Sequence, residues 1–320
     1  MILADAAQVD RNDIVEARDR ISGLVERTPL IATEVRGTPV WLKCECLQTG
    51  GAFKLRGATN RLLQLSPEER EKGVVAFSSG NHARGVAIAA RRLGIRAVIV
   101  MPSNAPAVKV EGTRGEGAEI VFYDRRSESR EEIAGRIARA SGATVVPSFD
   151  DPAIVAGQGT VGVEVVEQLG RSPARFVIPC GGGGLASGIA LAVPEAAIVI
   201  VEPEGWDDMA HSLDAGEIVP VGADAPPTLC DALQTRRVSP ITFGILRDRA
   251  AQALSVSDAQ AAEAVRFAWS RHELVVEPGG AVALAALLAG KLEPRDDTVV
   301  LLSGGNIDPA LHARILAKAA

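Results

Sequence analysis

Aromatic residues are scarce in this sequence: they make up 3% of its 320 residues, and Tyr123 is the only tyrosine. With 32 glycines and a hydrophobic content dominated by Ala, Val, Leu and Ile, the composition suits an α/β protein with many turns. The chain also lacks a dense Lys/Arg cluster, and its formal net charge is -6. This balance argues against a nucleic-acid-binding protein, for which a basic patch is typical.

Long apolar runs are missing as well. No stretch reaches the ~18 uncharged apolar residues that a membrane-spanning helix needs. Residues 1–20 contain neither a basic segment nor the apolar core of a signal peptide. We therefore expect a cytoplasmic protein that has no membrane partner.

Cysteine is rare, with four residues in the chain. In a reducing compartment we expect no disulfides between them. Cys44 and Cys46 flank Glu45, but this spacing does not match a zinc knuckle and no second Cys pair accompanies it. Alternation along a strand would place both on one face, so we interpret them as structural residues.

What the sequence does contain is a repeated succession of strand, turn and helix. Apolar runs typical of buried strands lie at 74–79, 96–102, 118–123, 143–148, 174–180, 197–203 and 298–304. Helical patterns lie at 81–93, 127–140, 152–169, 185–193 and 280–289. Ser257 and Gln260 form a capping box for a further helix, and Asp308 with Pro309 begins the last one. The pattern predicts a parallel sheet covered by helices on both faces.

Gly181 to Gly184 follow one of these strands and open a helix. Consecutive glycines at a helix N-terminus present backbone N–H groups that suit a phosphate. The loop is not a Walker motif, and it lacks the G-x-G-x-x-G spacing of a dinucleotide site. The alternative is a tight turn without a ligand.

Three further segments fall at strand ends or helix starts, where ligands bind in open α/β sheets. Lys54 lies in the otherwise apolar segment 52–58, which is unusual for lysine unless the side chain reaches the surface. The segment 78–82, Ser-Ser-Gly-Asn-His, suits a bound carboxylate or a simple helix cap. The fourth segment, 303–306, is Ser-Gly-Gly-Asn after the last strand.

Together these motifs resemble fold-type II pyridoxal-phosphate (PLP) enzymes, the tryptophan synthase β family. Within that family they are most similar to the branch of serine/threonine dehydratases, serine racemases and threo-3-hydroxyaspartate ammonia-lyases. The resemblance runs along nearly the whole chain, in the family's order and spacing. It rests on AFKLRGA (52–58), SSGNHA (78–83), GQGT (157–160), GGGGL (181–185), Glu202-Pro203, EPGG (277–280) and SGGN (303–306).

The resemblance implies a set of PLP-binding residues. Lys54 would form a Schiff base with PLP and later remove the substrate's Cα proton, which requires a lowered pKa. Asn81 would bind the 3′-oxygen of PLP. A hydroxyl from Ser303 at the pyridine nitrogen would leave that nitrogen unprotonated and favour prompt loss of a β-substituent. The complete implied set is Phe53, Lys54, Asn81, Gly181, Gly182, Gly183, Gly184, Leu185, Glu277 and Ser303.

The substrate implied by the resemblance is an α-amino acid. Ser79 matches the serine that acts on the opposite face of Cα in serine racemase, so the residue type permits both elimination and racemisation. Arg136 falls where mammalian serine racemase holds the distal carboxylate of a dicarboxylate, and we hypothesise that it admits 3-hydroxyaspartate. The alternative is a solvent-facing arginine paired with Glu132. The complete implied set is Ser78, Ser79, His82, Arg136 and Thr235.

The resemblance also implies a divalent cation site in the segment 202–208. Glu202 and Asp208 would bind through carboxylates and Trp206 through its carbonyl. Oxygen ligands of this kind suit Mg²⁺, Ca²⁺ or Mn²⁺. The alternative is an acidic surface loop.

The sequence thus predicts an α/β protein of fold-type II, with mostly parallel sheets and two domains. The large PLP-binding domain would combine 1–47 with 148–320, and the small substrate-side domain would be 48–147. The predicted reaction is PLP-dependent elimination of water and ammonia from L-Thr, L-Ser or 3-hydroxyaspartate, by a homodimer. Alternatives are a serine or aspartate racemase, a hydroxyectoine-pathway dehydratase, and a non-catalytic binding protein. Ala52 and Ala232 depart from the racemase pattern, which has serine and glycine there.

Overall fold

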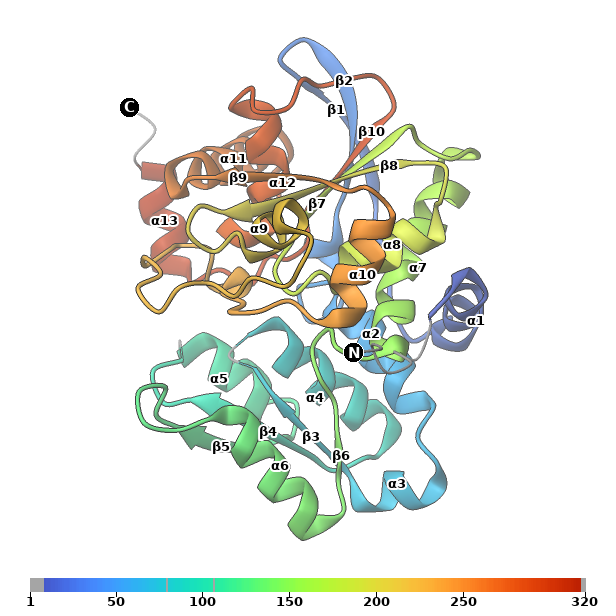
Figure 1. The fold of residues 1–320 in the computed structure, drawn as a ribbon, viewed down its shortest axis with the longest axis vertical. Coiled ribbons are helices and arrows are strands. Elements are labelled where there is room, and N and C mark those ends of the chain that lie inside the picture. Colours follow the sequence, from blue (N-terminus) through green and yellow to red (C-terminus); the bar gives the residue numbers. More distant parts are fainter. Residues whose placement is uncertain (1–8, 79, 106, 318–320) are drawn as a thin grey trace.

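Two separate sheets organise the chain. The computed structural model describes residues 9–78, 80–105 and 107–317, in which helices and strands alternate. In Figure 1 the six-stranded sheet lies in the upper part of the molecule and the four-stranded sheet in the lower part. The α/β class predicted from the sequence is therefore confirmed.

The larger sheet has the strand order β1-β2-β10-β7-β8-β9. Its strands are β1 (Leu30–Val35), β2 (Thr38–Lys43), β7 (Arg175–Pro179), β8 (Ala197–Pro203), β9 (Gln252–Val256) and β10 (Thr298–Leu301). β1 and β2 form an antiparallel hairpin around Arg36 and Gly37, whose φ angles are 51° and 78°. Positive φ at both central residues is what a two-residue hairpin turn requires. All other neighbouring strands are parallel, so only the hairpin departs from the predicted pattern.

The smaller sheet has the order β5-β4-β3-β6 and is parallel throughout. Its strands are β3 (Val74–Phe77), β4 (Ala97–Pro102), β5 (Glu119–Tyr123) and β6 (Thr144–Val145). Because the strands are parallel, their carboxyl ends meet at one edge, where the segment that follows β3 leads into a helix.

Helices cover both sheets. Those around the first half of the chain are α1 (Arg11–Ile21), α2 (Lys54–Leu63), α3 (Pro67–Lys72), α4 (Asn81–Leu93), α5 (Ala107–Arg114), α6 (Arg130–Ser141) and α7 (Pro152–Leu169). The others are α8 (Gly184–Ala192), α9 (Asp208–Ala215), α10 (Pro240–Asp248), α11 (Asp258–His272), α12 (Pro278–Leu288) and α13 (Pro309–Ala317). Two short 3₁₀ helices are η1 (Glu45–Leu47) and η2 (Asp231–Leu233). The predicted capping box of α11 is present, with Ser257 and Gln260 bonded reciprocally.

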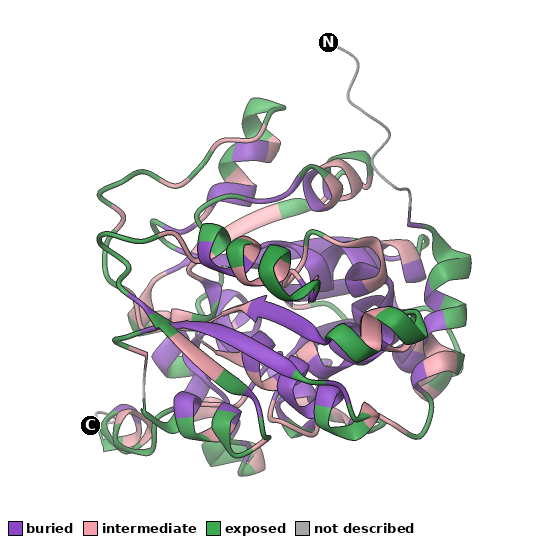
Figure 2. Ribbon diagram, turned by 90° about the horizontal axis from the view of Figure 1, so that it is seen from below, coloured by how far each residue is buried: buried purple, intermediate pink, exposed green. Residues whose placement is uncertain are grey.

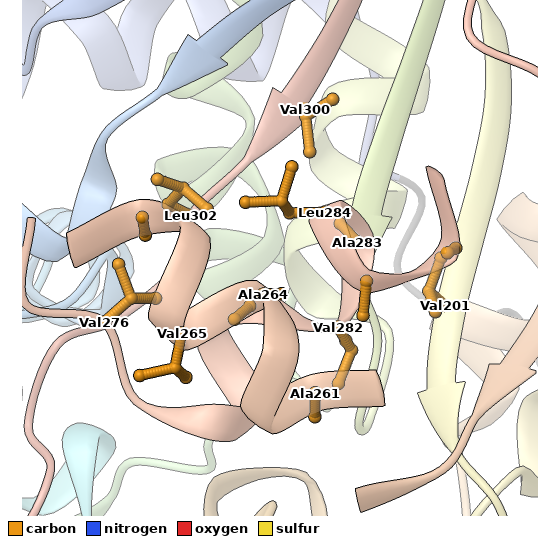
Figure 3. Close-up of a cluster of buried hydrophobic side chains, with 14 of the residues drawn as sticks. Val201, Ala261, Ala264, Val265, Val276, Val282, Ala283, Leu284, Val300 and Leu302 are labelled. Atoms are coloured by element: carbon orange, nitrogen blue, oxygen red, sulfur yellow. The ribbon is translucent and has the colours of Figure 1, made fainter. Parts of the chain in front are cut away.

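The core lies on both faces of the larger sheet. Along β8, Ile198 and Ile200 belong to one buried cluster, whereas Val199 and Val201 belong to the other. Figure 2 shows central strands that are buried along much of their length. In Figure 3, α11 and α12 bring small and branched side chains such as Val265 to one of these clusters. Strands buried on both faces explain the continuous apolar runs in the sequence.

Cys44 and Cys46 do not share a strand, contrary to the sequence-based prediction. β2 ends at Lys43, and Cys44 precedes η1, which contains Cys46. The chain turns here because Glu45 bonds the guanidinium of Arg56 on α2, at 2.8 Å. Both thiols are buried, and all four cysteines are free.

None of the helices in the described ranges is both long enough and apolar enough to cross a membrane.

Candidate active site

A cavity between the two sheets gathers the glycine- and serine-rich segments singled out in the sequence. Of the residues expected to bind PLP or substrate, its lining includes Phe53, Lys54, Ser78, Asn81, His82, Gly181, Gly182, Gly183, Gly184, Leu185, Thr235, Glu277 and Ser303. Ser79 lies outside the described residues, and Arg136 is not part of the lining. Segments separated by up to 250 positions in the chain therefore meet at one place.

Lys54 is the first residue of α2 and faces this cavity. The start of α2 is anchored beside the end of β10, because the Phe53 N–H donates to the Ser303 carbonyl at 3.2 Å and Ala52 forms an isolated bridge with Gly304. The Lys54 ammonium donates to the Ser148 carbonyl at 2.9 Å. Burial lowers the pKa of Lys54 to about 8. A lysine with this pKa has an appreciable neutral fraction near pH 7, and the neutral amine is the form that attacks a carbonyl carbon.

A buried ion cluster anchors α2 behind Lys54. Arg56 bonds Glu45 on η1 and Glu164 on α7, at 2.8 and 2.7 Å. Lys43, at the end of β2, bonds Glu164 at 2.7 Å. Two cations and two carboxylates balance one another, which buried charges require. The sequence analysis did not identify this cluster, because its pairs join positions up to 121 residues apart.

The glycine loop Gly181 to Gly184 connects β7 to α8 and leaves no room for side chains. A Cβ at Gly182 would lie 2.2 Å from the Phe149 ring, and one at Gly183, whose φ is 84°, would lie 2.8 Å from Met209. Among the described residues, no side chain caps the N-terminus of α8. The first N–H groups of α8 therefore remain available to an anion, and the positive end of the helix dipole favours one.

Asn81, the first residue of α4, is held by two side chains from the other end of the chain. Its amide donates to Glu277, the residue before α12, and its oxygen accepts from Asn306 at 2.8 Å. Lys109 lies 3.8 Å from the second carboxylate oxygen of Glu277 and pairs with Asp231 at 2.5 Å. Burial raises the pKa of Glu277. This network links the small sheet's helices to the larger sheet and fixes the orientation of the Asn81 amide.

Ser303 and Thr235 place hydroxyl-bearing side chains at the cavity. Ser303 follows β10, is buried, and bonds the Gly280 carbonyl through its N–H. The Thr235 hydroxyl oxygen lies 3.0 Å from where a Cβ of Gly181 would be. Thr235, which the sequence analysis proposed as a substrate-binding residue, thus lies next to the glycine loop.

His82 is buried at the start of α4, and its Nε2 lies 3.0 Å from the Val146 carbonyl. Burial, together with the nearby positive charge of Lys54, lowers the pKa of His82 to about 3. The imidazole is therefore neutral. Because a carbonyl only accepts, Nε2 carries the proton and donates to Val146.

The structure places Arg136 on the exposed face of α6, away from the cavity. Arg130, the first residue of the same helix, lines the cavity instead, with its guanidinium 5.4 Å from the Phe77 ring centroid. Ser129 caps α6, so Arg130 lies at the helix start that faces the carboxyl ends of the strands. Arg136 lies almost two turns further on, toward the opposite edge. Ser129, as a possible helix cap, is the feature of the sequence that could have indicated Arg130.

The residues proposed as cation ligands lie outside this cavity. The Glu202 carboxylate at the end of β8 accepts N–H bonds from Met209 and Ala210, at 3.2 and 2.9 Å. Both carboxylate oxygens of Asp208 are buried and have no partner among the described residues. Burial raises the pKa of Glu202, and it raises the pKa of Asp208 to about 7. The described residues contain no cluster of three or more His, Cys, Asp or Glu side chains that would hold a metal.

The comparison with known proteins agrees with this geometry. A family model described as "Pyridoxal-phosphate dependent enzyme" matches residues 21–304. The chain belongs to this family of PLP-dependent enzymes, and its α/β architecture is that of fold-type II.

Among its relatives, the chain is 44% identical to an L-threo-3-hydroxyaspartate ammonia-lyase of Pseudomonas sp, over 95% of this chain and 98% of that protein. It is 39% identical to a serine racemase of Schizosaccharomyces pombe, over 96% and 97% of the two chains. Among solved structures, a maize serine racemase matches with a TM-score of 0.90 at 36% identity, covering 97% of both chains. A threonine deaminase from T.th. matches with a TM-score of 0.86 at 40% identity, covering 93% of this chain and 99% of that one.

Proposed function

We propose that this enzyme is a PLP-dependent ammonia-lyase, which converts a β-hydroxy amino acid to a 2-keto acid and ammonia. The observation that carries the proposal is Lys54, an amine with a lowered pKa, facing a cavity that it shares with the glycine loop, Asn81 and Ser303. The names of the ammonia-lyase and deaminase relatives support the same reaction class.

We propose that residues around this cavity hold the separate groups of PLP. The N–H groups of the glycine loop would hold the phosphate at the start of α8. Side chains at Gly182 and Gly183 would collide with Phe149 and Met209, so glycine lets the backbone approach here. The Thr235 hydroxyl, which lies beside Gly181, would also bind the phosphate. Asn81, held by Glu277 and Asn306, would donate to the 3′-oxygen through an amide whose orientation is fixed. The other PLP-binding residues would be Phe53, Leu185 and Ser303.

PLP supplies an electron sink that acidifies the Cα proton of a bound amino acid. Lys54 takes that proton with its neutral amine, the form that its lowered pKa provides. The Ser303 hydroxyl would face the pyridine nitrogen of bound PLP and would leave that nitrogen unprotonated. PLP held in this way would be a weaker electron sink, which would favour loss of the β-hydroxyl over return of the proton. These roles favour elimination.

We propose 3-hydroxyaspartate as one substrate, with Arg130 binding its distal carboxylate. Arg130 lines the cavity, its fork can pair bidentately with a carboxylate, and its neighbour Phe77 supports the guanidinium plane. Ser78 and the segment that follows it would bind the α-carboxylate through N–H groups at the start of α4. L-Thr and L-Ser need no such arginine and remain candidate substrates.

Racemisation is the second candidate function. It is favoured by the SSGNHA segment, in which Ser79 matches the serine that returns a proton in serine racemases, and by the racemase relatives. Chiral analysis of recovered substrate separates racemisation from elimination, because only racemisation produces the opposite enantiomer.

We propose a divalent cation at Glu202, Asp208 and the carbonyl of Trp206. The support is the Asp208 carboxylate, which is buried with both oxygens unpartnered within the described part of the chain. A buried carboxylate in this state needs a proton or a cation, and an oxygen-only ligand set suits Mg²⁺, Ca²⁺ or Mn²⁺. The ion would stabilise the structure of this loop and would not contact the substrate, since the loop does not line the cavity.

We further propose that the enzyme is a cytoplasmic homodimer whose two sheets belong to two domains, with boundaries near residues 47 and 147. Four free, buried cysteines suit a reducing compartment. Leu47 and Val275 are exposed hydrophobic residues of the kind that a subunit interface covers. The PLP cavity between the sheets would close when substrate binds.

A keto-acid assay with L- and D-Ser, L- and D-Thr and the 3-hydroxyaspartate isomers tests the reaction. The proposal expects keto acid and ammonia in equal amounts, an absorbance near ~410 nm on PLP addition, and a borohydride-trapped adduct at Lys54. Lys54→Ala should lose all three signals. Lys72→Ala, which removes an exposed lysine of α3 paired with Glu68, serves as the control and should retain them. Absence of a Lys54 adduct in the wild-type protein would contradict the proposal.

A further inference from the structure

The segment 146–149 crosses from β6 to α7 between the two sheets and contacts three parts of the candidate site. The Val146 carbonyl accepts from His82 at 3.0 Å, and the Ser148 carbonyl accepts from the Lys54 ammonium at 2.9 Å. The Phe149 ring packs on the glycine loop, since a Cβ at Gly182 would fall 2.2 Å from it. Four consecutive residues thus touch His82, Lys54 and the glycine loop.

The bond between His82 and Val146 joins a neutral imidazole to a backbone carbonyl near neutral pH. The lowered pKa of His82, about 3, keeps the ring neutral, and the carbonyl fixes the proton on Nε2. Nδ1 is then a bare acceptor, and it is buried without a partner among the described residues. Within the described part of the chain, the hydrogen bond to the Val146 carbonyl is therefore the one that this side chain makes.

His82 and Lys54 reach the segment 146–149 from two helices in direct contact. A Cβ at Gly85 on α4 would lie 3.1 Å from the backbone of Lys54 and Leu55 on α2, so the two helices pack closely at this glycine. Both side chains donate to carbonyls that are two residues apart. A shift of the Val146 carbonyl would therefore move the Ser148 carbonyl, which is the acceptor for Lys54.

We propose that His82 is a positioning residue for Lys54: by holding the Val146 carbonyl it fixes the segment 146–149, so that the Ser148 carbonyl receives the Lys54 ammonium. The inference rests on the proposed function only in naming Lys54 as the PLP lysine. An ammonium forms each time Lys54 takes a proton from Cα, and the Ser148 carbonyl stabilises that charged form. The lysine then has a defined place when it is not bonded to PLP.

Other ionisable side chains line the same cavity, and each is already engaged. Lys109 pairs with Asp231, Arg130 pairs with Glu131, and Glu277 accepts from Asn81. The Ser148 carbonyl is the acceptor that the structure gives to the Lys54 ammonium. Removing this acceptor should lower the pKa of Lys54 further, because the charged form loses its hydrogen bond.

The matched variants His82→Gln and His82→Asn test the inference. Both carry a neutral amide, but only glutamine places its N–H about as far from the backbone as Nε2 of histidine. The first readout is the pH dependence of Lys54 labelling by formaldehyde and cyanoborohydride, followed by mass spectrometry, in the full chain freed of PLP. This readout needs no catalytic turnover. The second readout is kcat and KM of the PLP-loaded enzyme.

We expect His82→Gln to label with the wild-type midpoint, near pH 8. His82→Asn should label ~3- to 10-fold faster below that midpoint, as a pKa lowered by about half to one unit requires. Its kcat should fall ~10- to 100-fold with little change in KM, because Lys54 is misplaced. Equal midpoints in all three proteins, or the same shift in both variants, would overturn the inference. If His82→Asn does not fold, a displaced midpoint in His82→Gln overturns it. An inactive wild type with these labelling shifts would instead contradict the proposed function alone.

Discussion

Asn81 and Glu277 are 196 positions apart in the chain, yet the Asn81 amide donates directly to the Glu277 carboxylate. Asn81 begins α4 beside the smaller sheet, and Glu277 precedes α12 beside the larger one. The cavity therefore depends on a polar contact between the two sheets, as well as on apolar packing within each of them.

Glu277→Gln should weaken PLP binding while leaving the fold intact. Glutamine keeps an acceptor for Asn81 but removes the negative charge near Lys109, so the bond from the Asn81 amide becomes a neutral one that is weaker by about 1 kcal/mol. We expect Kd for PLP, followed by absorbance at ~410 nm, to rise ~3- to 10-fold, since 1.4 kcal/mol is a factor of ten. Glu273→Gln, at the exposed end of α11, is the control. Unchanged PLP affinity would argue against an orienting role for Glu277.

Gly183→Ala should weaken PLP binding, and it should destabilise the fold more than Gly170→Ala, in which backbone strain acts alone. Gly183 and Gly170 both have positive φ, 84° and 70°, but a Cβ at Gly183 meets Met209 at 2.8 Å whereas one at Gly170 meets nothing within 4 Å. Gly170→Ala should therefore cost about 1 kcal/mol of unfolding free energy, from strain. Gly183→Ala should cost about 1–3 kcal/mol more, from overpacking, and should bind PLP poorly. Chemical denaturation and PLP titration of the two variants make the comparison.

Arg130→Ala should lower kcat/KM for 3-hydroxyaspartate ~100-fold and change kcat/KM for L-Thr by less than ~3-fold. The reason is that a carboxylate left without its guanidinium partner in the cavity loses about 2–4 kcal/mol of binding. Arg136→Ala, on the exposed face of the same helix, should leave both values unchanged. A loss with Arg136→Ala alone would assign the substrate carboxylate to the other arginine.

The rate at which PLP reacts with the chain should rise with pH and level off above the pKa of Lys54. The pKa of about 8 is lowered by burial, so the reactive neutral amine increases as pH rises through that value. Below pH 7 the rate should fall ~10-fold per pH unit, following the neutral fraction. Stopped-flow absorbance after PLP addition measures it. A pH-independent rate between pH 6 and 9 would show that another step limits the reaction.

Chelation should lower thermal stability if Glu202 and Asp208 hold a cation. An ion whose free concentration is about 100 times its Kd raises the free energy of unfolding by about 2.7 kcal/mol, and EDTA removes that contribution. Adding Mg²⁺, Ca²⁺ or Mn²⁺ should restore Tm in the wild type but not in Asp208→Asn, which lacks one of the two carboxylates. If no ion changes the Tm of the chelated wild type, the cation proposal fails.

The sequence points to those residues of the candidate site that belong to motifs made of adjacent residues. Lys54, Asn81, the glycine loop and Ser303 are of this kind, and the structure brings them to one cavity. Arg136 was chosen because it falls where mammalian serine racemase holds a distal carboxylate, and such a match along a helix does not tell which face the side chain occupies. To predict that Arg130 lines the cavity, one would have needed to know where α6 begins.

Contacts between distant positions were not predictable in the same way. Nothing local indicates that Lys43 and Arg56 share Glu164, or that the turn at Arg36 pairs β1 with β2. The hairpin was missed because its turn lacks the Asn-Gly or Asp-Gly pair that usually marks one. The 3₁₀ helix η2, which contains Asp231, was not predicted either.

The buried ion cluster has a consequence for the order in which the polypeptide assembles. Arg56 and Glu45 are synthesised early, whereas Glu164 emerges from the ribosome 108 residues after Arg56. The whole smaller sheet, from Val74 to Val145, lies between them. Until α7 arrives, the guanidinium of Arg56 has half of its carboxylate partners, and Lys43 lacks its own. The charges that anchor the helix carrying Lys54 are therefore complete only after the whole segment that forms the smaller sheet has been synthesised.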